Sequence, residues 1–189
     1  MTESRNSTPA AGSAAMDPHA ASVREERLLL LLSIFVGVIS GLLVVSFRMA
    51  IEWLTVLLQG SVPGPHQPRL LIVPVLAGIV IAVLVRFVFP AARGSGVNQT
   101  KAALYVYNGY ISFKTVIGKF ITSSISIGCG HSLGPEDPSL QIGAGVASII
   151  ARKLGLSRQR MRVFAPIGAA AGLAAAFNAP ISAILFVIE

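Results

Sequence analysis

Two adjacent acidic residues, Glu136 and Asp137, have the types and the position to do chemistry in this chain. They lie in the stretch 128–145, which is too rich in glycine and proline to form an ordinary helix interior. Pro138 is a natural first residue for a helix, with Ser139 beside it, and strongly apolar sequence follows. An acid at a broken helix start among apolar residues is costly, so this arrangement predicts a site that handles ions or protons.

The composition indicates a membrane protein. Of the 189 residues, 53% are hydrophobic and only 12% are charged, whereas about 25% of a soluble domain is charged. The net charge of +7 is spread between apolar runs and aromatic residues are few, so positive flanks of membrane helices explain it better than nucleic-acid binding. Cys129 is the single cysteine and has only His131 nearby, which is too few ligands for a metal site. We therefore expect no metal, no cofactor and no nucleic-acid partner.

The chain divides into a tail and a membrane domain. Residues 1–27 are rich in alanine, serine, proline and charge, which predicts a disordered tail rather than a signal peptide. Arg24 and Arg27 stand against the first apolar run and favour a cytoplasmic N-terminus. Residues 28–189 are predicted to form an all-α, polytopic domain of a multi-pass protein of the cell membrane.

The first apolar run predicts a long, tilted membrane helix. It has no charged residue over 28–47, and the helical pattern continues to about residue 58. Arg48 and Glu52 are four residues apart and can form a structural ion pair. Gly37 and Gly41 form a face of small residues for close helix packing.

A second spanning helix is predicted over 70–89, and Pro90 stops it. The glycine-rich turn 93–98 then leads into a short helix around 99–107, whose first backbone N–H groups would make an anion site. Taken alone, this turn is more typical of an ordinary loop than of an anion site. It lacks the third glycine and the βαβ context of a dinucleotide-binding fingerprint.

The later segments are shorter. Lys114 and Lys119 flank the apolar run 116–127, which is too short to span a bilayer cleanly. Another helix should follow the acidic stretch to about residue 154, and Ser157 is placed to cap the next one.

The last apolar segment predicts two shorter helices. It runs over 163–188 and is interrupted near 178–180 by Asn-Ala-Pro. The sequence ends at Glu189 without a cap or polar tail, which suggests a truncated chain.

Three motifs together resemble the CLC family of chloride channels and chloride/proton antiporters. They are Gly94-Ser95-Gly96, the Gly-Pro-Glu-Asp-Pro stretch at 134–138 running into Gln-Ile-Gly, and the long small-residue motif at 168–180. The resemblance covers about 28–189. It implies tilted and broken helices in two inverted halves around an anion path, a homodimer with a pore in each subunit, and a chain that holds the first half.

The resemblance also implies roles for individual residues. Ser95 is similar to the serine whose hydroxyl donates to the bound anion, and Gly94 and Gly96 would let the backbone approach that anion. Glu136 is similar to the gating glutamate, whose carboxylate competes with the anion and swings away when it is protonated. Chloride and possibly protons are the implied partners, together with the lipid bilayer.

Departures from the family pattern surround the gate. Val97-Asn98 stands where Ile-Pro is usual, and Pro135 stands where arginine or lysine is common, which removes a positive charge. Asp137 stands where glycine is common. It could repel the charge of Glu136 or cap the helix start beside Pro138.

These observations predict chloride transport through a channel or a chloride/proton antiporter with a glutamate gate. The alternative is a half-protein that does not transport by itself and acts only as an assembly partner. By the resemblance, an inner glutamate at residue 190 would distinguish an antiporter from a channel. That position lies beyond Glu189, so the sequence leaves both possibilities open. The carboxylates have no partner base, metal cluster or nucleophile, so no enzyme is expected.

Overall fold

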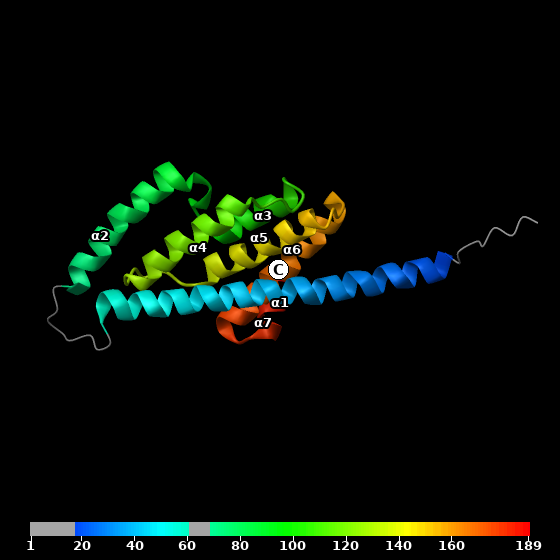
Figure 1. Cartoon of the computed structure of the whole chain (residues 1–189), viewed down its shortest axis with the longest axis horizontal. Helices are drawn as coiled ribbons and strands as arrows, with labels where there is room; N and C mark the ends of the chain where they lie inside the picture. Colours follow the sequence, from blue (N-terminus) through cyan, green and yellow to red (C-terminus); the bar gives the residue numbers. More distant parts are fainter. Residues whose placement is uncertain (1–17, 61–68) are drawn as a thin grey trace, which may run out of the picture. The chain divides into compact units, whose positions relative to one another are not determined.

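A computed structural model describes residues 18–60 and 69–189, and every regular element in these ranges is helical (Figure 1). The contacts divide the chain into one unit that ends at Leu32 and a second unit, Ser33–Glu189, which holds the candidate site. The prediction of an all-α fold is confirmed. In chain order the elements are α1 (Pro18–Gln59), α2 (Arg69–Val83), η1 (Leu84–Val88, a π-helix), η2 (Pro90–Ala92, a 3₁₀ turn), α3 (Gly96–Tyr105), α4 (Phe113–Gly128), α5 (Glu136–Lys153), α6 (Arg158–Phe177) and α7 (Pro180–Ile188).

Two helices of the described chain are long and apolar enough to span a membrane. They cover Glu26–Gln59 within α1 and Arg69–Val88, which comprises α2 and η1. Both match the predicted spans closely. However, α1 begins at Pro18, inside the segment assigned to a disordered tail, because alanine, glutamate and arginine there are good helix formers. The rest of that segment, residues 1–17, lies outside the described residues.

The face of small residues on α1, predicted to serve close helix packing, packs against α6. A Cβ placed on Gly37 would lie 3.9 Å from the Cβ of Ala171, and one on Gly41 would lie 3.8 Å from the Cβ of Ala175. Arg48 lies further along α1, 3.8 Å from Glu52, which confirms the predicted ion pair. Both partners are exposed, so the pair contributes little stability by itself.

Helices α5 and α6 cross with their backbones in direct contact. A Cβ on Gly143 would lie 2.2 Å from the carbonyl oxygen of Gly168, and one on Gly172 would lie 2.6 Å from that of Ser139. Ser40 of α1 donates a hydrogen bond to the Gly143 carbonyl at 3.3 Å. This crossing fixes α5, whose first turn carries both candidate carboxylates.

We expect Gly168→Ala to destabilise the intact protein, because the new methyl group would meet the Gly143 carbonyl and neither backbone can move aside. Overpacking of this kind costs on the order of 1–3 kcal/mol. Thermal melting in detergent measures the loss, and Gly37→Ala is the matched control because its methyl group has room beside Ala171. Equal melting temperatures for the two variants would contradict the backbone contact.

The helix ends follow the predicted local chemistry, with one correction. Ser157 caps α6 by accepting a hydrogen bond from the Arg160 N–H, and Asn178 ends α6 in the left-handed conformation at φ 54°. Helix α5, however, begins at Glu136 and not at Pro138. A proline fits there because the first-turn N–H groups have no partner within their own helix.

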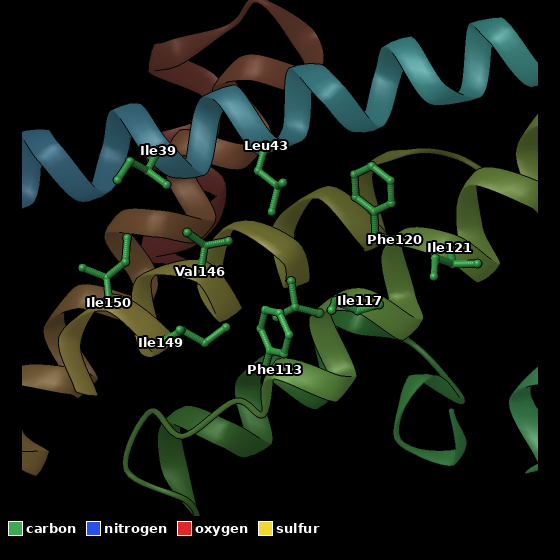
Figure 2. A pocket seen from close by; sticks show the side chains of 10 residues that line it. Ile39, Leu43, Phe113, Ile117, Phe120, Ile121, Val146, Ile149 and Ile150 are labelled. Carbon is green, nitrogen blue, oxygen red and sulfur yellow. The ribbon is translucent and has the colours of Figure 1, made fainter. Parts of the chain in front are cut away.

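An apolar pocket lies between α1, α4 and α5 (Figure 2). Ile39 and Leu43 of α1 face Val146, Ile149 and Ile150 of α5 across it. The α4 side chains close its remaining side. No side chain around the pocket carries a hydrogen-bonding group, so it offers nothing to an ion and the candidate site lies elsewhere.

Candidate anion site

The turn before α3 presents hydrogen-bond donors in one direction. Gly94 has φ +91°, a conformation that side chains disfavour, and it turns the chain into an extended Ser95. Ser95 is the N-cap of α3 and accepts a bond from the Asn98 N–H. The N–H groups of Gly96 and Val97 have no partner within the helix and lie at the positive end of its dipole. This geometry suits a negatively charged group.

A negatively charged side chain occupies this position. The carboxylate of Asp137 accepts hydrogen bonds from Ser95 Oγ at 2.7 Å, from the Gly96 N–H at 2.6 Å and from the Val97 N–H at 3.1 Å. Asp137 was expected to cap its own helix beside Pro138, and this was wrong: its carboxylate accepts bonds at the start of α3 instead. The N-cap residue of α5 itself is Pro135, whose side chain makes no capping hydrogen bond.

Lys119 of α4 completes the site and was not predicted to belong to it. Its ammonium group donates to the Gly94 carbonyl at 2.6 Å and lies 3.4 Å from Asp137 Oδ2. The residue is only 5% exposed, so it does not flank the apolar run at a surface as the sequence suggested. A lysine inside an apolar, serine-rich helix was the available signal, because a buried charge requires a partner.

Gly96 is the point of closest approach between α3 and α5. A Cβ there would lie 2.5 Å from the Asp137 carbonyl oxygen and 2.9 Å from the Cβ of Gln141. The Gln141 side chain donates to Gln99, which in turn donates to the Arg93 carbonyl. These contacts hold the turn against the first turn of α5, which brings the backbone of Asp137 next to the Ser95 turn.

Glu136 points into different surroundings. It is exposed, and its carboxylate has no hydrogen bond or ion pair to any residue that the structure describes. It lines a cavity of about 520 Å³ together with side chains of α6, α7 and the break between them: Leu173, Phe177, Ala179, Ser182, Ala183 and Phe186. The structure thus gathers the turn 94–96 around Asp137 and Lys119, and Glu136 lies outside this group of contacts.

Several proteins are similar to this chain. The sequence model described as voltage-gated chloride channel matches residues 77–189. The H(+)/Cl(-) exchange transporter ClcA of Citrobacter koseri is 34% identical over 171 residues, and the ClcA of Salmonella arizonae is 33% identical over 168 residues. Each alignment covers 85% of this chain and 36% of the relative, so the chain spans little more than a third of their length.

Solved structures agree with this relationship. A slow cyanobacterial Cl⁻/H⁺ antiporter superposes with a TM-score of 0.68 at 27% identity, covering 84% of this chain and 39% of the antiporter. A CLC-type fluoride/proton antiporter superposes with a TM-score of 0.73, covering 87% of this chain and 40% of the antiporter. At 24% sequence identity, this similarity supports the fold only. The family match extends over more than half of the sequence, and the chain therefore belongs to the CLC family of voltage-gated chloride channels and antiporters.

Proposed function

We propose that the protein containing this chain exchanges chloride and protons across a membrane, with the start of α3 on the chloride path and Glu136 as the gate. One observation carries the proposal: the hydroxyl of Ser95 and the N–H groups of Gly96 and Val97 converge on a single negatively charged group. The exchange activity in the name of the ClcA relatives supports the choice of ions.

The site binds a halide through the same physics that holds the carboxylate. The aligned peptide dipoles of α3 place roughly half a positive charge at its N-terminus, and the Lys119 ammonium group adds a full charge nearby. Gly94 supplies the turn, and the missing side chain of Gly96 leaves the backbone donors accessible. A dehydrated chloride ion replaces its water with these donors.

Glu136 has the properties required of a gate. Its carboxylate borders the α6–α7 cavity and is tied to no partner in the described chain, so it can move when its charge changes. When ionised it competes with an anion for positively polarised backbone, and when protonated it does not. Pro135 and Pro138 restrict the backbone on either side, which limits this motion to the side chain.

The membrane arrangement follows from the two long apolar helices. We infer that α1 and α2 cross the bilayer in a multi-pass protein whose N-terminus is cytoplasmic, since Arg24 and Arg27 lie at the N-terminal end of the first span. The exposed apolar side chains of α1 and α2 are compatible with contact to lipid or to further parts of the protein. The protein is expected to function as a homodimer.

We expect Ser95→Pro to shift the preference of the intact protein from chloride toward nitrate by about tenfold, or about 1.4 kcal/mol. The backbone of Ser95, at φ −71°, is in the range that proline adopts, so the turn can be kept while the hydroxyl donor is lost. The substitution also removes the Ser95 N–H and the cap that the hydroxyl gives to the Asn98 N–H. Chloride depends more on that donor because it is more strongly hydrated than nitrate. It therefore needs stronger hydrogen bonds from the protein to replace the water that it loses on binding. Anion flux from reconstituted liposomes measures the ratio.

Asn98→Ala is the matched control for this selectivity shift. Its side chain lies one turn further along α3 and is exposed, and it makes no contact with Asp137 among the described hydrogen bonds. It should leave the chloride-to-nitrate ratio unchanged. An unaltered ratio in Ser95→Pro would remove Ser95 from the chloride path.

A further inference from the structure

Asp137 fills the site that the proposed function assigns to chloride. We propose that Asp137 is a built-in competitor at the start of α3, so that an anion binds there only when this carboxylate has left. The inference rests on the proposed function, because it requires that the Ser95 turn is an anion site. Asp137 would be a second competing carboxylate, one residue beyond Glu136. Its competition would set the affinity of the site for chloride.

The hydrogen bonds to Asp137 occupy all three donors of the Ser95 turn that the proposed function assigns to chloride. Oδ1 of Asp137 takes the Ser95 hydroxyl and the Val97 N–H, and Oδ2 takes the Gly96 N–H. All three lengths lie between 2.6 and 3.1 Å, so each bond is fully formed. A halide that used these donors would lie where the carboxylate oxygens now lie. Occupation by Asp137 and occupation by chloride therefore exclude each other.

The charges explain why the empty site would attract an anion. With Asp137 in place, its negative charge offsets the Lys119 ammonium group 3.4 Å away. Lys119 is held separately by its 2.6 Å bond to the Gly94 carbonyl and stays when Asp137 leaves. The vacated site then retains a buried cation and the positive end of α3 without a counter-ion. A diffusible anion is the group that restores neutrality.

The side chain of Asp137 is partly exposed to solvent, so it can rotate away from the donors. It is 31% exposed, whereas that of Lys119 is 7% exposed, so the acid borders open space and the base does not. It belongs to the first turn of α5, whose backbone is fixed by the crossing with α6. A rotation of the side chain can therefore free the donors without unwinding the helix.

A purely structural role for Asp137 makes a different prediction. If the carboxylate only capped α3, its neutralisation would loosen the turn and weaken chloride binding. If it competes, neutralisation strengthens chloride binding by the inverse of the fraction of sites that are open. A carboxylate that occupies about nine sites in ten gives an increase in affinity of about tenfold.

The test is chloride binding to the purified, intact Asp137→Asn protein, measured by titration calorimetry with gluconate as the replacement anion. Asparagine keeps the shape of aspartate but is neutral, and its NH₂ group would face one of the donors. Its side chain therefore binds the donors of the Ser95 turn only weakly. We expect the apparent Kd for chloride to fall at least about tenfold. Glu52→Gln, which neutralises an exposed acid on α1, is the matched control and should leave the Kd unchanged. An unchanged or higher Kd in Asp137→Asn would overturn the proposal.

Ser95→Ala separates this inference from the proposed function. If it weakens chloride binding in the wild type while Asp137→Asn fails to strengthen it, the anion site stands and the competitor is refuted. If Ser95→Ala changes chloride binding neither in the wild type nor in Asp137→Asn, the anion site itself is refuted.

A second measurement covers the case in which Asp137→Asn is too unstable to titrate. Asp137→Gly leaves the donors open, so replacing gluconate by chloride should raise its melting temperature more than that of the wild type. An equal or smaller rise would overturn the competitor.

Discussion

Replacing Glu136 with alanine is expected to make chloride flux through the intact protein independent of pH and to abolish coupled proton transport. Glu136 carries the one ionisable side chain among the described residues that line the α6–α7 cavity. Under the proposed function, its removal takes away both the group that blocks the path when ionised and the group that carries a proton. The expected phenotype is constant flux, because no carboxylate remains there to titrate.

Chloride efflux from reconstituted liposomes, followed from acidic to neutral pH with simultaneous recording of proton uptake, measures this effect. Glu52→Ala is the matched control, since Glu52 is also exposed but its partner is Arg48 on α1. It should retain the pH dependence and the proton uptake of the wild type. A steep pH dependence that survives in Glu136→Ala would transfer the gate to another residue, with Asp137 as the nearest candidate.

The fold could be predicted wherever local chemistry decides it. Ser157 caps α6 and Asn178 ends it, because a hydroxyl satisfies exposed N–H groups and asparagine tolerates the left-handed conformation. The spans were visible because uninterrupted apolar sequence fixes their length. The exact start of α5 could not be predicted, because proline fits either the first or the third helical position and the local sequence does not choose between them.

The candidate site could be predicted only in part, because it is assembled across the chain. Ser95 and its glycines were identified by a resemblance to known motifs, and the resemblance could not show what lies against them. Asp137 is 42 residues from Ser95 in sequence, and no local sequence pattern indicates that the two side chains are in contact. Lys119 was assigned to a flank because a charge in an apolar run is ordinarily at its end, whereas here two oxygen partners compensate its burial.

The largest loss of stability is expected for Lys119→Met. Methionine fills a similar volume but leaves the Gly94 carbonyl without its donor and the Asp137 carboxylate without its cation. We expect a loss on the order of 2–3 kcal/mol of unfolding free energy, which is less than a fully buried pair would lose. The reduction reflects the exposure of the Asp137 side chain, which keeps part of its solvation.

Denaturant or thermal unfolding of the intact protein in detergent measures this loss, with Lys114→Met as the matched control. Lys114 lies on the same helix but is exposed, so its replacement should change stability by no more than about 0.5 kcal/mol. Equal effects of the two substitutions would show that the buried contacts of Lys119 contribute nothing.

The double variant Lys119→Met/Asp137→Asn separates the two contacts of the lysine. If Lys119 acts mainly by neutralising Asp137, the double variant should regain much of the stability, because no uncompensated charge remains. If the bond to the Gly94 carbonyl dominates, the double variant should remain as unstable as Lys119→Met. The first result would mean that Lys119 stabilises the protein mainly by compensating the charge that Asp137 places at the start of α3, and only secondarily by holding the Gly94 carbonyl.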